Sequence, residues 1–137
     1  MGNLKGSCLC GEVNYELTSK IVNVVNCHCK FCRSHSGAAF STYAALPYAS
    51  LIITSGEEKL SSFKVEEGEK HFCSVCGTPI FNLNSKYPGA CMVYFGTLES
   101  LGDIRPKVNV WWESKLGWVD SIASIHSVAQ GVERKNA

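Results

Sequence analysis

The sequence predicts a mainly β protein with little helix, folded as one small domain. Short alternating or apolar runs, separated by glycine, proline and small polar residues, are typical of strands joined by turns. Of the 137 residues, 45% are hydrophobic and 14 are aromatic (6 Phe, 5 Tyr and 3 Trp), which gives enough apolar volume for one core. Because the chain has no repeat, linker or low-complexity segment, we expect a single domain over residues 1–137, with a flexible tail at residues 132–137.

The predicted strands follow the chain as a meander. Residues 13–17 (VNYEL) alternate after a glycine, and residues 38–46 mix small and aromatic side chains before a proline. Residues 51–54 and 60–65 flank a polar turn of the sequence SGEE. The remaining predicted strands, each bounded by turn residues, are residues 71–73, 80–83, 91–95 and 108–112.

Only two segments favour helix. Residues 30–36 are long enough for a short turn of helix that follows a group of cysteines. Residues 120–129 (DSIASIHSVA) predict a short C-terminal helix, with Asp120 as its N-terminal cap. Neither segment changes the prediction of a β domain.

The charge balance excludes several classes of partner. With 13 Lys+Arg against 12 Asp+Glu, the net charge of +1 provides no basic surface for nucleic acid or for an anionic membrane. No apolar run approaches the roughly 18 residues of a membrane helix, and the first residues lack the hydrophobic stretch of a signal peptide. We therefore expect a cytoplasmic protein that binds neither nucleic acid nor membranes.

The placement of the eight cysteines points to metal binding. Seven of them fall into three tight groups, separated by 16 and 40 residues, and close grouping disfavours disulfides within a group. Without a secretion signal, zinc explains such groups better than disulfide or redox chemistry, or than inert buried thiols. The groups are Cys8 and Cys10; Cys27, Cys29 and Cys32; and Cys73 and Cys76, while Cys91 stands alone.

Two of the groups predict a closed structural zinc site. Two residues between Cys73 and Cys76 let both sulfurs face one ion, and Gly77 permits the backbone conformation of a zinc knuckle. Cys8 and Cys10, on an irregular turn, supply two further sulfurs. Four thiolates at a Zn–S distance of about 2.3 Å would form a closed structural site.

The middle group predicts a different kind of site. Cys27, Cys29 and Cys32 can surround an ion from three corners, and three protein ligands with an open fourth position are typical of catalytic zinc. A competing assignment joins Cys29 and Cys32 to Cys73 and Cys76 as a zinc ribbon and leaves the other three cysteines unused. Its gap of 40 residues is long, since ribbon pairs usually lie about 15–20 residues apart.

Four segments of the sequence resemble the glutathione-dependent formaldehyde-activating enzyme family, which also includes the centromere protein V domain. They are GSCLCGEV, NCHCKFCRSHSGAAF, HFCSVCGTPIF and RPKVNVWWESKLGW, and they cover roughly residues 6–118 in the family's order. The resemblance implies a zinc-stabilised β domain of stacked antiparallel sheets. It also implies a structural zinc on Cys8, Cys10, Cys73 and Cys76 and a catalytic zinc on Cys27, Cys29 and Cys32.

The resemblance further implies a carbon–sulfur lyase whose substrates are a small thiol such as glutathione and a small aldehyde, with formaldehyde giving S-hydroxymethylglutathione. An open zinc position suits this chemistry, because it can stabilise a thiolate or polarise an aldehyde oxygen. Three thiolates reduce the formal charge of the ion from +2 to −1, which favours thiol exchange over strong carbonyl activation. The alternative is a noncatalytic zinc module that binds proteins.

Other residues near the motifs have weaker assignments. Lys30 and Arg33 could meet a carboxylate of a peptide-like thiol, or be ordinary solvated charges. In an alternating stretch the ring of His28 would point away from the metal, and we expect Cys91 to be a packed core thiol. Many members of the family have a histidine after the Arg-Pro pair, whereas this chain has Asn109.

Overall fold

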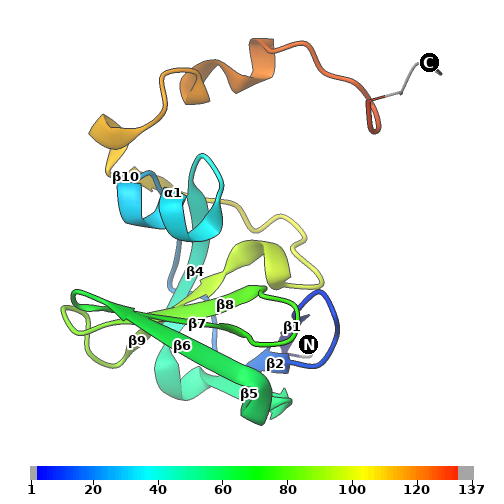
Figure 1. The fold of residues 1–137 in the computed structure, drawn as a ribbon, viewed down its shortest axis with the longest axis vertical. Helices are drawn as coiled ribbons and strands as arrows, with labels where there is room; N and C mark the ends of the chain where they lie inside the picture. Colours follow the sequence, from blue (N-terminus) through cyan, green and yellow to red (C-terminus); the bar gives the residue numbers. More distant parts are fainter. Residues whose placement is uncertain (1–2, 133–137) are drawn as a thin grey trace.

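A computed structural model describes residues 3–132 and shows ten strands in two sheets (Figure 1). The small sheet has the order β1-β2-β5, and the large sheet has the order β10-β3-β4-β9-β8-β7-β6. In chain order the strands are β1 (Leu4–Ser7), β2 (Asn14–Leu17), β3 (Asn23–Cys27), β4 (Ser41–Pro47), β5 (Leu51–Ser55), β6 (Leu60–Val65), β7 (Gly68–Cys73), β8 (Pro79–Asn84), β9 (Ala90–Tyr94) and β10 (Val108–Val110).

The prediction of a mainly β protein is confirmed. Every predicted strand has a counterpart, and β1 and β3 are two additional strands that the pattern did not indicate. β10 pairs with β3 in parallel, and the other strand pairs within the described residues are antiparallel. Parallel pairing needs a long connection, and here the whole chain between β3 and β10 provides it.

The predicted helix at residues 30–36 is confirmed as α1 (Lys30–Ser36). The sulfur of Cys29 caps its first turn by accepting the amide of Cys32 at 3.3 Å. At the other end, Gly37 takes a left-handed conformation and donates its amide to the carbonyl of Arg33. The cap residue of this short helix is therefore itself one of the predicted metal ligands.

The predicted C-terminal helix over residues 120–129 is wrong. The structure has a 3-10 helix at Val119–Ser124 instead, and its cap is Trp118 without a side-chain hydrogen bond, so that Asp120 is not the cap. The segment has only Val119 buried, and a helix this short needs tertiary packing to persist. The Ser121 hydroxyl also donates to the carbonyl of Trp118 at 3.2 Å, which competes with helical pairing.

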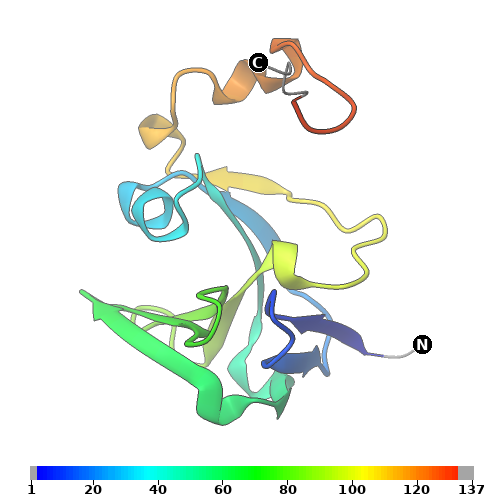
Figure 2. The same ribbon diagram turned by 45° about the vertical axis from the view of Figure 1, so that its right-hand side comes forward.

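The C-terminal segment runs outside the two sheets. In Figures 1 and 2 the orange and red ribbon extends beyond α1 and β10 and does not cover either sheet. Its apolar side chains Ile122, Ile125 and Val128 are exposed. The flexible tail predicted at residues 132–137 lies, except for Val132, outside the described residues. Within residues 3–132, none of the helices has the length and apolar character that crossing a membrane requires.

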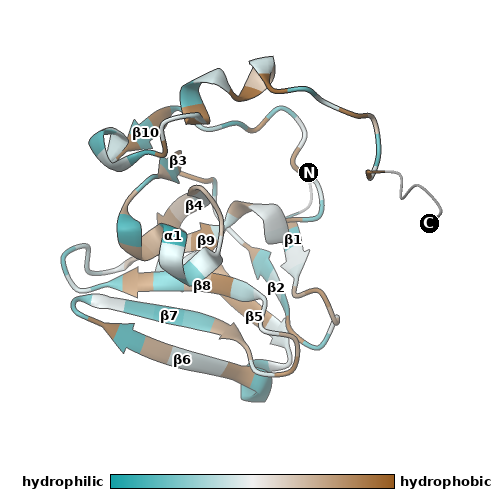
Figure 3. Cartoon of the chain, turned by 45° about the horizontal axis from the view of Figure 1, so that its top comes forward, coloured by the Kyte–Doolittle hydropathy of each residue, from teal (hydrophilic) through white to brown (hydrophobic). Residues whose placement is uncertain are grey.

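The structure has two apolar clusters, and each of them contains cysteines of the motifs. The larger one includes Tyr15, Leu46 and Ile80 from both sheets, and it contains Cys8 and Cys73. The smaller one combines Cys27 and Cys32 with Tyr43 and Tyr94 on the large sheet. Figure 3 shows apolar residues, drawn in brown, among polar ones on the strands of the large sheet. The cysteines are therefore part of the packed interior.

The turn between β5 and β6 contacts two cysteine-bearing loops, one with Cys8 and Cys10 and the other with Cys73 and Cys76. Gly56, with a φ of +79°, lies so close to the loop after Cys10 that an added Cβ would be 1.9 Å from the carbonyl oxygen of Glu12. On its other side, the carbonyl of Lys59 accepts the amide of Ser74 at 2.8 Å. This turn thus fixes the two cysteine loops relative to each other.

We expect Gly56→Ala to destabilise the protein by more than about 3 kcal/mol, because it combines left-handed strain with a backbone clash. Gly89→Ala is the matched control, since Gly89 has a φ of +81° and nothing within 4 Å of an added Cβ. The control should cost only the conformational strain, about 1 kcal/mol. Urea unfolding of both variants measures the difference, and equal losses would show that the approach to Glu12 does not matter.

Candidate metal centres

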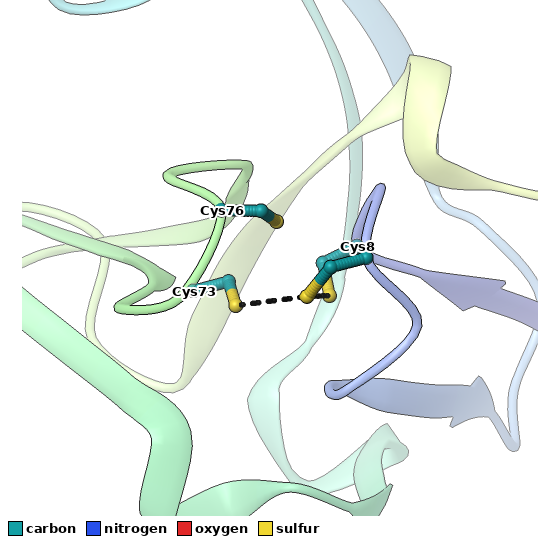
Figure 4. Close-up of side chains that lie close together, drawn as sticks. Cys8, Cys73 and Cys76 are labelled. Carbon is teal, nitrogen blue, oxygen red and sulfur yellow. Dashed lines mark hydrogen bonds between the residues drawn. The ribbon is translucent and has the colours of Figure 1, made fainter.

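The structure brings Cys8, Cys10, Cys73 and Cys76 together at one point. Their sulfurs all lie within 4.8 Å of one another. Cys8 and Cys10 come from the loop between β1 and β2, and Cys73 and Cys76 come from the end of β7 and the turn before β8. In Figure 4 the labelled side chains of Cys8, Cys73 and Cys76 converge from these two loops. We call this group the four-cysteine cluster.

Local hydrogen bonds hold the two loops in place. Gly77 has a φ of +78°, as its place in a knuckle predicts, and its amide donates to the carbonyl of Cys73 at 2.8 Å. The Thr78 hydroxyl accepts the amide of Leu9 at 3.1 Å and lies 3.1 Å from the sulfur of Cys76. Thr78 therefore links the loop of one cysteine pair to the sulfur of the other.

The surroundings of the four-cysteine cluster shift the pKa values of its thiols in opposite directions. Hydrogen bonds from the hydroxyl and the amide of Thr78 lower the pKa of Cys76 to about 5. The amide of Glu12 favours the thiolate of Cys10, but burial and the neighbouring sulfurs outweigh it and raise the pKa of Cys10 to about 12. Four crowded thiols cannot all ionise without a cation, so metal binding must displace protons from this cluster.

Cys27, Cys29 and Cys32 form a second, separate group, which we call the three-cysteine cluster. Their sulfurs also lie within 4.8 Å of one another, and within the described residues no ring nitrogen or carboxylate joins them. Cys27 ends β3, Cys29 caps α1 and Cys32 lies in its first turn. Cys27 and Cys32 are buried and Cys29 is half-buried, so the accessible side of the cluster lies at Cys29. The competing zinc-ribbon grouping is not the one that the fold assembles.

Hydrogen bonds favour a thiolate at Cys32. A hydrogen bond from the thiol of Cys27 contributes most, and the hydroxyl of Tyr43 also donates to the Cys32 sulfur, at 3.2 Å. Together these bonds lower the pKa of Cys32 to about 5, although burial opposes them. The same contact with Cys32, together with burial, raises the pKa of Cys27. The cluster thus holds one stabilised thiolate before a cation arrives.

His28 lies between two of these cysteines in sequence, but its ring contacts other groups. Its Nε2 is 3.2 Å from Oδ1 of Asn109, and the ring centroid is 4.9 Å from that of Phe40 and 5.0 Å from that of Trp112. The side chain is buried, and its Nδ1 has no hydrogen-bond partner within the described part of the chain. Asn109 therefore orients the ring of His28 from the parallel strand β10.

Four other candidate residues lie outside the two cysteine clusters. Lys30 is exposed at the start of α1, and Arg33 is half-buried one turn later. Cys91 is fully buried within the larger apolar cluster, which confirms it as a core thiol. His71 stacks on Phe81 with ring centroids 4.3 Å apart and pairs with Glu69 at 3.0 Å. Neither Cys91 nor His71 belongs to a cysteine cluster.

Sequence analysis missed the polar residues that support the sulfurs. Thr78 follows Gly77 directly, and its proximity to a cysteine motif is the one signal that could have indicated it. Tyr43 and Tyr94 are aromatic residues in strands, which fit a core as well as a site. Lys70 lies in a polar stretch and Asn82 between apolar neighbours, yet both are buried, and a β-bulge between His71 and Phe72 shifts the alternation near Lys70.

A small, mainly β protein with one four-cysteine and one three-cysteine cluster is a candidate two-site metalloprotein. The family model of the glutathione-dependent formaldehyde-activating enzyme matches residues 3–114. The chain therefore belongs to this family, as its motifs indicate. A curated Halomonas elongata protein, provisionally named a glutathione-dependent formaldehyde-activating enzyme, is 28% identical over 127 residues, which cover 85% of this chain and 80% of the relative.

A solved structure supports the fold. The crystal structure of a Rhodobacter sphaeroides protein matches with a TM-score of 0.63 and 24% identity over 77% of this chain and 98% of that chain. At this identity the match extends only to the arrangement of the strands.

We expect Cys73→Ala to remove one metal ion per chain and to lower the melting temperature strongly, because binding energy at a closed site is folding energy. Cys91→Ala is the matched control, since both thiols are fully buried. It should keep the metal content and lose only about 1 kcal/mol, the range of a small core truncation. Elemental analysis and thermal unfolding measure both quantities. An unchanged ion count in Cys73→Ala would contradict a metal role for the four-cysteine cluster.

Proposed function

We propose that the protein binds two zinc ions and acts as a carbon–sulfur lyase-type enzyme. In this proposal it forms or cleaves an adduct between a small thiol and a small carbonyl compound, such as S-hydroxymethylglutathione from glutathione and formaldehyde. The observation that carries the proposal is the unequal size of the two clusters. Four sulfurs complete a tetrahedral shell, whereas three sulfurs leave one position for a ligand from solution.

The spacing of the sulfurs supports zinc. A tetrahedral ion with Zn–S distances of about 2.3 Å requires sulfurs about 3.8 Å apart along each edge. The sulfur of Cys10 lies 3.6 Å from that of Cys8 and 3.9 Å from that of Cys73. All-thiolate donors at this spacing suit zinc better than Mg²⁺ or Ca²⁺, which prefer oxygen. The four-cysteine cluster would thus hold a structural ion.

The three-cysteine cluster would provide the reactive position. A zinc ion bound there would stabilise a substrate thiol as its thiolate. Cys27, Cys29 and Cys32 would hold the ion, and the hydroxyl of Tyr43 would stabilise the charge on Cys32. In the synthetic direction the thiol sulfur forms a bond to the carbonyl carbon, the carbonyl oxygen gains the electron pair, and the thiol proton ends on that oxygen. The reverse direction breaks the same carbon–sulfur bond.

Substrate binding and location follow from the same chemistry. Lys30 and Arg33 lie on α1 next to Cys29 and Cys32, where either cation could meet a carboxylate of a peptide-like thiol. All eight cysteines of the chain are free thiols, and clustered thiolates persist in a reducing compartment. This supports a cytoplasmic location within the proposal.

We expect glutathione to bind the zinc-loaded protein as a thiolate and to release about one proton at neutral pH. The apparent pKa of the bound thiol should fall well below the roughly 8.5 of a free thiol. Calorimetry in buffers of different ionisation enthalpy reports the released proton. Cys29→Ser is the informative variant, because serine is a good helix cap and a poor zinc ligand, so it should keep α1 while it abolishes thiol binding.

Exchange measurements by NMR would then show whether the protein accelerates the interconversion of formaldehyde and its glutathione adduct above the rate in buffer. Cys91→Ala, which leaves both clusters intact, should match the unchanged protein. Binding that is independent of the buffer, or that survives in Cys29→Ser, would contradict the proposed mechanism. Two bound ions without any thiol binding would favour a noncatalytic zinc module instead.

We also expect a chelator to remove the ions in two steps. The three-cysteine cluster has fewer ligands and an accessible side at Cys29, so it should lose its ion first while the fold persists. Circular dichroism and elemental analysis, followed together during titration with a chelator, separate the two steps. If both ions left in one step together with unfolding, the three-cysteine cluster would not be an open site.

A further inference from the structure

A row of buried polar side chains crosses the large sheet next to the three-cysteine cluster. Tyr43 of β4 pairs in register with Tyr94 of β9, and Asn82 of β8 pairs in register with Lys70 of β7. Lys70 is 8% exposed and Asn82 is 6% exposed, which is unusual for residues of these types. The row therefore needs an explanation beyond packing.

Close polar contacts lead along the row from Lys70 to a cysteine. With its amide oriented to satisfy its neighbours, Asn82 places Oδ1 at 3.1 Å from Nζ of Lys70 and at 3.2 Å from the hydroxyl of Tyr94. The hydroxyl of Tyr43 lies 3.2 Å from the same oxygen and 3.2 Å from the sulfur of Cys32. Asn82 and Tyr43 thus lie in contact between the buried ammonium of Lys70 and the three-cysteine cluster.

The chemistry of each group fixes the direction of these bonds. An ammonium group only donates, so Oδ1 of Asn82 must face Lys70. The ammonium and the Tyr94 hydroxyl can then fill both lone pairs of that oxygen. This leaves the single proton of Tyr43 free to point at the sulfur of Cys32, which is the stronger acceptor when it is a thiolate.

The ammonium of Lys70 lacks an acidic partner. The only ion pair within residues 3–132 joins His71 to Glu69, so no described carboxylate lies within 4.0 Å of Lys70. A buried cation without a counter-charge is strongly disfavoured. At the far end of the row is the sulfur of Cys32, one of the three cysteines proposed to bind zinc, and it accepts the proton of Tyr43. The row therefore joins Lys70 to a cluster whose sulfurs could supply a compensating negative charge.

We propose that Lys70 is a positioning residue of the three-cysteine site, whose ammonium balances the thiolate charge there and directs, through Asn82, the proton of Tyr43 toward Cys32. The proposal rests on the proposed function, in which this cluster binds zinc. Three thiolates and a divalent ion sum to a charge of −1, and Lys70 brings the site to zero. A substrate thiolate then lowers the net charge of the site only from zero to −1, so Lys70 favours an anionic ligand.

Cobalt(II) titration tests the proposal, because cobalt reports thiolate ligation through sulfur-to-metal charge-transfer bands. Lys70→Met removes the charge and the hydrogen bond, whereas Lys70→Gln keeps a donor for Asn82 and removes only the charge. Lys64→Met is the matched control, since it makes the same change in net charge at an exposed position of β6. Cys29→Ser protein gives the spectrum of the four-cysteine cluster alone, so that the difference isolates the other site.

We expect both Lys70 variants to lose about 10–100-fold in cobalt affinity at the three-cysteine site, which is the usual cost of losing a group that supports metal ligands. The charge-transfer band should move to lower energy, because thiolates without a nearby cation give up electrons more easily. The four-cysteine cluster should keep its affinity and spectrum in all variants. Lys64→Met should match the unchanged protein at both sites.

Retained affinity and an unshifted band in Lys70→Gln would overturn the proposal, since the charge would then be unnecessary. Asn82→Asp provides a nearly isosteric second test if the Lys70 variants fail to fold, because its carboxylate would neutralise the ammonium in place. It should lower cobalt affinity similarly, and an unchanged affinity there would also overturn the proposal. An unchanged protein that binds one cobalt ion would refute the proposed function itself, whereas two ions with unaffected variants would refute only the role of Lys70.

Discussion

Mutual repulsion between closely spaced thiolates is the constraint on which the rest of this structure depends. The sulfur of Cys10 is held 3.6 Å from that of Cys8 and 3.9 Å from that of Cys73, and like charges at such distances repel. The fold must therefore hold the sulfurs close together before a bound cation can stabilise them. It does so with contacts such as the close approach of Gly56 to Glu12 and the hydrogen bond that the Leu9 amide donates to the Thr78 hydroxyl, which connect segments far apart in the chain.

The two clusters meet this constraint on different supports. The four-cysteine cluster lies on two loops, and a bound ion would itself fasten them, since metal-binding energy adds to folding energy at such sites. The three-cysteine cluster instead spans the end of β3 and the first turn of α1, above a sheet packed with Tyr43 and Tyr94. Regular elements hold the three sulfurs in place without help from a metal.

The sequence predicted most of the local structure, because alternation and turn residues act over a few positions. Residues 30–36 formed the expected helix, and Gly77 took the conformation that its knuckle requires. Prediction failed where burial decides. Residues 120–129 carry a helical pattern but have almost nothing to pack against, and β3 was missed because Asn23 and Asn26 interrupt its apolar residues. Local patterns could not show that the parallel strand β10 would bring Asn109 to His28.

The candidate site shows the same division between local and long-range information. The spacing of the cysteines indicated which sulfurs belong to one motif, but the choice between the two possible groupings needed the fold or the family resemblance. Lys70 lies 38 residues beyond Cys32 in sequence, and nothing local to either residue connects them. Only the strand order β4-β9-β8-β7 places Lys70 in a row with Tyr43. Strand pairing brings such residues beside the cysteines, so in a β domain they emerge from topology, while the cysteine motifs themselves can be recognised from spacing.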